Sequence, residues 1–239
     1  MSPRAQTPGA GDGPQESAAE RAYVFVKHQI LSGGYPGGAL ISEGEVSAAV
    51  HVSRTPVREA FLRLEVEGLL RLYPKRGALV TPVSASEIRE VLDARLAIER
   101  HAARTAIGSG QHHELAARLR AILGDHEVPG MARDAGQFTQ LDQQFHRALV
   151  DAAGNRLLAD FYATLRDRQL RMGTAALLRD PLRYDKILAE HAALAELINE
   201  GDAEAVAEAL AVHLAATRAS LSGVLSAAAL IPPPRSLAS

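Results

Sequence analysis

Residues 52–60 decide the fold and read Val52-Ser53-Arg54-Thr55-Pro56-Val57-Arg58-Glu59-Ala60. Ser53 is a residue type that caps helix N-termini, and Pro56 falls in the first turn, where a missing backbone N–H costs little. An apolar stripe recurs from there at helical spacing and consists of Val57, Ala60, Phe61 and Leu64. The stretch therefore predicts a helix that begins at Ser53 and buries one face.

Three polar side chains remain on the outward side near the start of this helix, namely Arg54, Thr55 and Arg58. The two arginines are four residues apart, so they project from one face and can reach base edges or phosphates together. A capping box, Ser42-Glu43-Gly44-Glu45, opens another helix just before, and that helix ends near residues 50–51. Two helices separated by so short a turn predict a helix-turn-helix unit.

A short hairpin is expected directly after these helices. Gly68 closes the third helix, and residues 69–73 and 78–83 favour two strands around Pro74-Lys75-Arg76-Gly77. Alone, the two positive charges at the tip would indicate only a solvated turn. Beside a helix-turn-helix they predict a wing whose Lys75, Arg76 and Gly77 contact the DNA backbone or minor groove.

Composition sets the limits of the remaining interpretation. A chain of 239 residues has room for two modest domains, and its net charge of −2 divides into +2 over residues 17–83 and −4 elsewhere. Charge alone would therefore not have predicted a nucleic-acid partner. The absence of cysteine excludes disulfides and thiolate metal sites. Without a signal peptide or a long apolar run, we expect a cytoplasmic protein with no membrane partner.

The chain as a whole is expected to be mainly α, with a winged helix-turn-helix domain followed by an all-α bundle of about six helices. We place a disordered tail at residues 1–16, the DNA-binding domain at 17–83, the bundle at 84–228 and a loose tail at 229–239. A second capping box, Ser84-Ala85-Ser86-Glu87, starts the bundle almost without a linker. Its helices are predicted near 84–108, 111–127, 131–153, 155–178, 182–200 and 202–226.

Four polar residues of the bundle fall on apolar helix faces: Asp142, His146, His191 and His213. Asp142 and His146 are four residues apart on one helix, and each of the other two lies on a helix of its own. A carboxylate with three imidazoles suits a divalent first-row ion, with zinc favoured over nickel or manganese. Taken alone, each histidine would be interpreted as a core residue that is hydrogen-bonded to a neighbour. A bundle in which the histidines are only structural therefore stays open as an alternative.

Two arginines also fall on predicted inward stripes, Arg95 and Arg168. A buried arginine needs a partner. For Arg95 that partner is either Glu99, one turn further along, or the carboxylate of a small acid held at the metal. The same effector role is open to Arg168.

This order of parts resembles the GntR superfamily of bacterial transcription regulators, in the FadR-like branch with an FCD-type ligand domain. The resemblance covers about residues 17–226 and is carried by residues 52–60 and by the set formed by Asp142, His146, His191 and His213, which matches the family's metal-ligand pattern. The short helical domain is similar to the VanR-type variant. Two departures are Gly44, where the family usually has Arg, and His51, where it commonly has Gly; His tolerates positive φ better than most residues.

The resemblance implies a homodimer that binds a palindromic stretch of double-stranded operator DNA and responds, as a repressor, to a small organic acid. It also implies operator contacts from Ser53, Arg54, Thr55 and Arg58, with the wing on the backbone. The main rival is a metal-dependent enzyme built on the bundle. No Glu-x-x-His pair, His-Glu-x-x-His, Gly-x-Ser-x-Gly or P-loop occurs in the sequence, so we expect no enzymatic activity.

Overall fold

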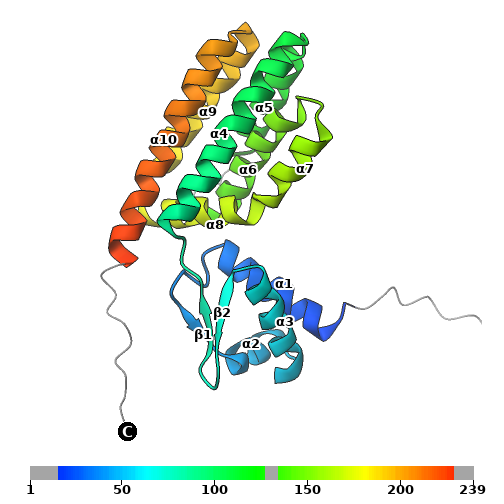
Figure 1. The fold of residues 1–239 in the computed structure, drawn as a ribbon, viewed down its shortest axis with the longest axis vertical. Coiled ribbons are helices and arrows are strands. Elements are labelled where there is room, and N and C mark those ends of the chain that lie inside the picture. The colour runs from blue at the N-terminus through cyan, green and yellow to red at the C-terminus, as the bar shows by residue number, and fades with distance from the viewer. Residues whose placement is uncertain (1–15, 127–133, 229–239) are drawn as a thin grey trace, which may run out of the picture.

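The computed structural model describes residues 16–126 and 134–228, which form an N-terminal winged-helix unit and a helical bundle stacked along the long axis (Figure 1). The N-terminal unit consists of α1 (Ala18–Leu31), β1 (Leu40–Ile41), α2 (Glu43–Val50), α3 (Arg54–Val66), β2 (Leu70–Tyr73) and β3 (Gly77–Val80). The bundle consists of α4 (Ala85–Gly108), α5 (His112–His126), α6 (Ala135–Asp151), α7 (Arg156–Thr164), α8 (Arg166–Arg179), α9 (Arg183–Glu200) and α10 (Ala203–Ala228). The predicted fold class is confirmed. The predicted tails lie outside the described residues, apart from residue 16.

The start of α2 follows the capping rule that the sequence predicted. The Ser42 hydroxyl accepts from the Glu45 N–H at 3.1 Å, and the Glu45 carboxylate accepts from the Ser42 N–H at 2.7 Å. The helix ends at His51 in the left-handed region, with φ 54°, so the position that commonly holds Gly is filled here by a histidine with positive φ. Ser53 occupies the cap position of α3, as predicted, although its side chain makes no capping hydrogen bond to a described residue.

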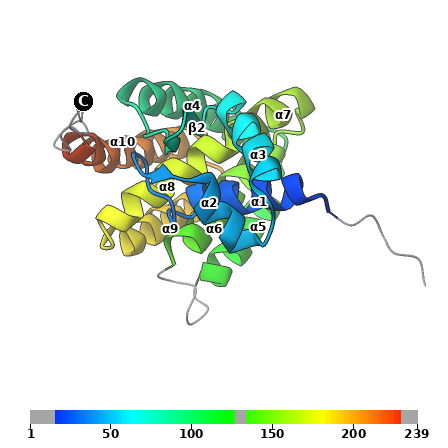
Figure 2. The ribbon, with the colours of Figure 1, turned by 90° about the horizontal axis from the view of Figure 1, so that it is seen from below.

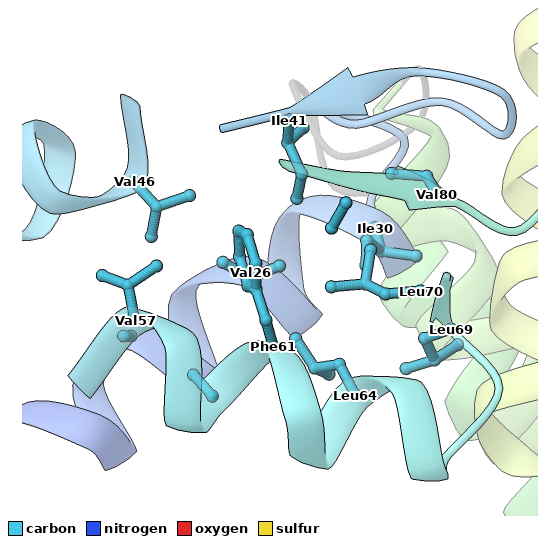
Figure 3. Packing of buried hydrophobic residues seen from close by; sticks show 13 residues of the cluster. Val26, Ile30, Ile41, Val46, Val57, Phe61, Leu64, Leu69, Leu70 and Val80 are labelled. Carbon is cyan, nitrogen blue, oxygen red and sulfur yellow. The ribbon is translucent and has the colours of Figure 1, made fainter. Parts of the chain in front are cut away.

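The core of the N-terminal unit lies between α1, α3 and the sheet, as Figure 3 shows. Val26 and Ile30 of α1 meet Phe61 and Leu64 of α3, and Val80 of β3 closes the cluster on the sheet side. Each such side chain, once buried, stabilises the fold by about 1.5–3 kcal/mol. This packing fixes the roll of α3, so its opposite face, which carries Arg54, Thr55 and Arg58, is turned to solvent.

The sheet is antiparallel with strand order β1-β3-β2, and β3 therefore lies in the middle. β2 and β3 form the predicted hairpin, in which Tyr73 pairs with Gly77. The third strand, β1, was not predicted; its Ile41 pairs with Ala78 of β3. It ties the wing to the start of α2, because Ser42, the cap of α2, follows Ile41 directly.

The bundle places α4 beside α10 and packs α5 against α6 and α9 (Figure 1). α8 lies across the end of the bundle that faces the N-terminal unit, and it contacts α1 (Figures 1 and 2). The predicted helix 155–178 is wrong: the chain breaks at Leu165 into α7 and α8, giving seven helices in the described part of the bundle. At the break the Leu165 N–H bonds to the Tyr162 carbonyl, three residues back instead of four, which tightens the turn and redirects the chain.

Side-chain hydrogen bonds join α8 to the N-terminal unit. Thr174 donates to the main-chain carbonyl of Leu31 at 2.9 Å, and Arg171 donates to the carbonyl of Thr81 at 3.2 Å. Arg171 also bonds to Glu87 of α4 at 2.6 Å. Glu87 therefore does not complete the predicted second capping box, although the Ser84 hydroxyl does accept from the Glu87 N–H at 3.1 Å. Among the described residues, no helix combines the length and apolar character that crossing a bilayer requires.

Candidate metal centre and DNA-binding surface

The bundle brings the four predicted ligand residues together at one point. Asp142 and His146 come from α6, His191 from α9 and His213 from α10. One potential donor atom from each lies within 4.8 Å of the other three. Ligands 2.0–2.2 Å from one first-row ion span at most about 4.4 Å, so only a small contraction separates the set from coordination. The three imidazoles are buried and the carboxylate is half-buried.

Two carboxylates outside this set orient the histidines. Glu99 Oε2 lies 2.8 Å from His146 Nδ1, and Glu190 Oε2 lies 2.6 Å from His213 Nδ1. An ionised carboxylate only accepts, so each Nδ1 carries a proton and, in a neutral ring, each Nε2 keeps its lone pair. This arrangement, a histidine held from behind by a carboxylate, is the one that metal-ligating histidines commonly show.

The Nε2 atoms of His146 and His191 both lie near the Asp142 carboxylate. His146 Nε2 is buried, has no hydrogen-bond partner among the described residues and lies 3.9 Å from Asp142 Oδ1. His191 Nε2 lies 3.5 Å from the same oxygen, and its ring stacks on Phe145 with a centroid distance of 4.2 Å. Lone pairs that converge in a buried space repel one another unless a cation or a proton lies between them. The donor set therefore fits a divalent cation.

Glu99 is the hub of the surrounding polar network. Its carboxylate accepts from Arg95 Nε at 2.8 Å and from the Tyr162 hydroxyl at 2.7 Å, besides its contact with His146. Burial alone would raise the pKa of Glu99, but Arg95 and His146 outweigh that effect and hold the pKa below its ordinary value. Burial raises the pKa of Tyr162, and the neighbouring Glu99 raises it further. The predicted Arg95–Glu99 ion pair is thus present and charged.

A second carboxylate, Glu190, holds the other side of the centre. Arg183 binds it through both terminal nitrogens, at 2.5 Å and 2.8 Å. Burial opposes ionisation of Glu190, yet its hydrogen bonds from His213 and Arg183 lower its pKa to about 2. Burial lowers the pKa of His213, and the hydrogen bond to Glu190 offsets only part of that effect. The lowered pKa favours the neutral ring that a metal ligand requires.

A largely apolar cavity of about 40 Å³ lies beside the four-residue centre and shares Asp142 and His213 with it. Arg95, Thr139, Gln169 and Arg183 are further polar members of its wall, and α4, α6, α8, α9 and α10 all contribute to it. Arg95 Nη2 has no hydrogen-bond partner among the described residues, although Arg95 Nε is bonded to Glu99. The guanidinium of Arg95 can therefore keep its ion pair and still bind an anion in the cavity.

Arg168 does not reach this interior, and its predicted inward position is wrong. Its side chain is 51% exposed, and its nearest carboxylate oxygen is Glu87 Oε1 at 3.7 Å. The cause is the break at Leu165, which changes the helix register on which the prediction was based. Gln169, the residue that follows Arg168, is buried instead.

The candidate DNA-binding surface forms at the beginning of α3. Ser53, Arg54, Thr55 and Arg58 are all exposed there. Arg58 is held by Glu43 of α2, with Nε and Nη2 at 2.8 Å and 3.0 Å from its two carboxylate oxygens. A Cβ built on Gly44 would lie 3.6 Å from Arg54 Nη2, so this guanidinium lies over the glycine that stands where the family usually has Arg. The structure thus brings together the side chains predicted for this helix.

The wing lies across an open groove from these arginines. The groove is lined by Glu43, Gly44, Arg54 and Arg58 on one side and by the turn Pro74-Lys75-Arg76-Gly77 on the other. Lys75 and Arg76 are exposed, and Lys75 has φ 63°. Gly77 has φ 102°, and a Cβ there would come 2.3 Å from the Ile41 carbonyl oxygen, so the turn requires glycine. Positive charge is therefore presented from two sides of one groove.

Several residues around the centre of the bundle were missed from the sequence. Glu190 precedes His191 directly, so helical spacing placed it on another face, although it bonds to His213. Arg183 lies at the beginning of α9, seven residues before Glu190, to which it bonds. The spacing of these two residues was the only sign in the sequence that they form a pair. Gln169 was missed because the helix break shifted the register.

Comparisons with known proteins agree with both halves of the molecule. Residues 18–80 match the sequence model of the gntR family of bacterial regulatory proteins, and residues 90–216 match that of the FCD domain. The chain is 29% identical over 207 residues to the HTH-type transcriptional repressor RspR of Escherichia coli, covering 84% of this chain and 87% of that protein. It is 27% identical over 198 residues to the gluconate operon transcriptional repressor of Bacillus licheniformis, covering 81% of each. The solved structure of E. coli McbR/YncC superposes with a TM-score of 0.66 at 22% identity, covering 87% of this chain and 98% of that one.

Proposed function

The chain belongs to the GntR family of bacterial regulatory proteins and carries an FCD domain, and from that premise we propose that it is a metabolite-responsive repressor. It is a transcriptional regulator and not an enzyme. In the proposed mechanism, residues 17–83 of a homodimer bind a palindromic operator. Residues 84–228 bind a small carboxylate beside a divalent metal ion, and this binding weakens the hold on DNA.

The metal proposal depends on one observation, the convergence of His146 Nε2 and His191 Nε2 on Asp142 Oδ1 in a buried space. Asp142, His146, His191 and His213 would hold the ion, and zinc suits this set of one oxygen and three nitrogen donors. When bound, the ion supplies a fixed positive charge that anchors an acid. Glu99 and Glu190 keep the histidine rings turned toward it, and Phe145 supports the ring of His191.

The proposed effector site is the cavity beside this centre. Arg95 provides the anion partner, because this residue lines the cavity and its Nη2 is buried without an acceptor among the described residues. Arg183 lines the same cavity, but Glu190 already binds both of its terminal nitrogens. A carboxylate that accepts from Arg95 would therefore complete a charge-assisted hydrogen bond that the protein leaves open.

On the DNA side, base contacts and phosphate contacts divide between two elements. Arg54 and Thr55, at the exposed N-terminal end of α3, are placed to contact base edges in a major groove. Arg58 starts from its ion pair with Glu43, so a phosphate must compete with that carboxylate. Lys75 and Arg76 on the wing would contact phosphates and set the position of the unit on the duplex.

Coupling between the two sites would pass through α8. One side of α8 lines the effector cavity through Gln169, Met172 and Gly173. Its other contacts reach the N-terminal unit, through the bonds of Arg171 to Thr81 and of Thr174 to Leu31. A ligand that favours one position of α8 would therefore bias the placement of the winged helix.

The proposal is tested with the purified full chain. Metal analysis is expected to find about one divalent ion per chain in wild type and in the exposed control His113→Ala, and none in His191→Ala. Selection of bound sequences from random DNA is expected to recover an inverted repeat, whose affinity then falls when candidate acids are added. Full metal occupancy in His191→Ala would contradict the ligand assignment and leave the histidines structural. An absence of sequence preference would contradict operator binding.

A further inference from the structure

Glu43 places a carboxylate beside the arginines of the candidate DNA-binding surface. It is the first residue of α2, and it lines the groove together with Arg54 and Arg58 of α3. Among the described residues that line this groove, Glu65 is the other acid, and it accepts from the main-chain N–H of Leu72 at 2.8 Å. Glu65 therefore joins α3 to β2, whereas Glu43 binds a side chain of the candidate surface itself.

The contact between Glu43 and Arg58 uses one edge of the guanidinium. Nε donates to Glu43 Oε1 at 2.8 Å and Nη2 donates to Oε2 at 3.0 Å, so two parallel hydrogen bonds fix the plane of the group. The N–H groups of Nη1 and the second N–H of Nη2 lie outside this contact. Among the described residues they have no acceptor, and the side chain of Arg58 is 68% exposed. The edge formed by Nη1 and Nη2 is therefore open to a ligand.

The same ion pair favours a base over a phosphate as the ligand of Arg58. The hydrogen bonds from Arg58, together with the charges of Arg58 and Arg54, hold the pKa of Glu43 below its ordinary value, so this carboxylate is ionised at neutral pH. Its negative charge offsets that of Arg58 and repels a phosphate. Base edges carry no net charge, and guanine presents two acceptors, O6 and N7, to a bidentate arginine. The open edge of Arg58 therefore suits a guanine.

We infer that Glu43 is a positioning residue for base recognition, which holds one edge of Arg58 so that the other edge binds a guanine in each operator half-site. This inference rests on the proposed operator binding. Arginine is flexible, and a side chain that is ordered in advance loses less entropy on binding. Without the carboxylate, Arg58 is free to contact phosphates, which carry no sequence information. Glu43 therefore lowers the affinity for DNA of any sequence and raises the preference for one sequence.

The test begins with selection of bound duplexes from random DNA by the full chain. Wild type is expected to recover an inverted repeat. Arg58→Ala is expected to recover the same repeat without the preference for guanine at one position of each half-site, which assigns that position to Arg58. In competition gel shifts, wild type should prefer guanine there by about 5- to 150-fold, the range of a bidentate arginine contact.

Glu43→Ala is expected to lose most of that guanine preference, by about fivefold or more, and to keep the preferences at the other positions. Its affinity for a duplex without the repeat should rise. The salt dependence of that binding should increase by about one counterion, because Arg58 can then contact a phosphate. A carboxylate that only stabilised α2 would produce neither gain.

Glu59→Ala is the matched control for this variant. Glu59 is exposed on α3 and is not among the described residues that line the groove. The substitution removes the same charge from the same domain, so it should leave the guanine preference as in wild type.

Three results would overturn the inference. Recovery of guanine at every position by Arg58→Ala would show that Arg58 reads no base. An unchanged guanine preference in Glu43→Ala would show that Arg58 needs no carboxylate to hold it. Loss of preference at all positions in Glu43→Ala would assign Glu43 to the stability of α2. In each case an inverted repeat recovered by wild type would leave the proposed operator binding in place, whereas no sequence preference in wild type would remove both.

Discussion

The hydroxyl of Thr174, on α8, donates a 2.9 Å hydrogen bond to the main-chain carbonyl of Leu31, the last residue of α1. The same hydroxyl lies 3.4 Å from that of Thr139, which lines the cavity beside the four-residue centre. α6 and α8 approach so closely here that a Cβ on Gly173 would come 2.5 Å from Thr139 Cγ2. The Thr174 hydrogen bond is therefore one of the contacts through which a displacement of α8 at the cavity would reach the winged-helix unit.

We expect Thr174→Val to uncouple effector binding from DNA release. Valine keeps the shape of threonine but removes the donor to the Leu31 carbonyl, whereas the metal ligands and Gln169 stay untouched. The affinity for acid should therefore remain within about twofold. The effect of the acid on operator affinity should fall by at least about fivefold, from the 5- to 150-fold typical of allosteric coupling. Gel-shift titrations with and without acid measure both quantities.

Thr105→Val provides the matched control for this variant, because the Thr105 hydroxyl is exposed on α4 and bonds within its own helix to the His101 carbonyl. It should respond to acid as wild type does. If Thr174→Val also responds fully, coupling passes elsewhere, through the Arg171–Thr81 contact for example.

The two arginine positions of the DNA-binding surface should fail in different ways. Arg54→Ala removes a candidate base contact worth about 1–3 kcal/mol of discrimination, so operator preference should fall while non-specific binding persists. Arg76→Ala, on the wing, should weaken binding to all sequences alike and reduce the salt dependence of the affinity by about one counterion. Competition gel shifts at several salt concentrations distinguish the two. Arg118→Ala, at an exposed position of α5, should change neither.

Glu99→Gln should damage both the bundle and its metal site. The substitution leaves buried Arg95 without its counter-charge, and breaking a buried pair in this way costs about 3–5 kcal/mol of unfolding free energy. It also weakens the carboxylate support behind His146, for which a 10- to 100-fold loss of metal affinity is typical. Denaturant unfolding of the chelator-treated protein and a metal competition titration measure the two losses separately.

The double variant Arg95→Met with Glu99→Gln tests this explanation. Removal of both charges should restore much of the stability but none of the metal affinity, because only the buried charge is relieved. Recovery of both together would mean that the metal loss was merely a consequence of unfolding.

Local signals were sufficient to predict much of the fold and of the candidate centre. The spacing of Asp142 and His146, and the apolar stripes around His191 and His213, placed four side chains on inward faces of three helices, and the structure brings them together. The capping box at Ser42 defined the start of α2 for a similar reason, since its hydrogen bonds lie within four residues.

The features that were missed depend on contacts between distant segments. No glycine or proline marks the break at Leu165, so the sequence predicted one helix through it and placed Arg168 inside. Strand β1 has two residues and exists because β3 lies beside it. Glu190 was missed because it bonds to a histidine on another helix, a relation that helical spacing within α9 cannot reveal.

The wing offers a comparison of two glycines that both have positive φ. Gly68 has φ 75° and open space where a Cβ would lie, whereas at Gly77, with φ 102°, a Cβ would come 2.3 Å from the Ile41 carbonyl oxygen. Gly68→Ala should therefore lower the free energy of unfolding by only about 1–2 kcal/mol, the strain of an alanine in the left-handed conformation. Gly77→Ala should cost more, because β1 must also move away from β3, where Ile41 pairs with Ala78.

This difference should extend to DNA binding. Displacement of β1 disturbs the turn that carries Lys75 and Arg76, so Gly77→Ala should weaken operator affinity even under conditions where the protein remains folded. Gly68→Ala leaves that turn in place and should bind nearly as wild type. Denaturant unfolding and gel shifts on the same preparations check both expectations. If both variants lose the same stability and the same operator affinity, the wing tolerates the displacement of β1. The close approach of Gly77 to Ile41 would then not position Lys75 and Arg76.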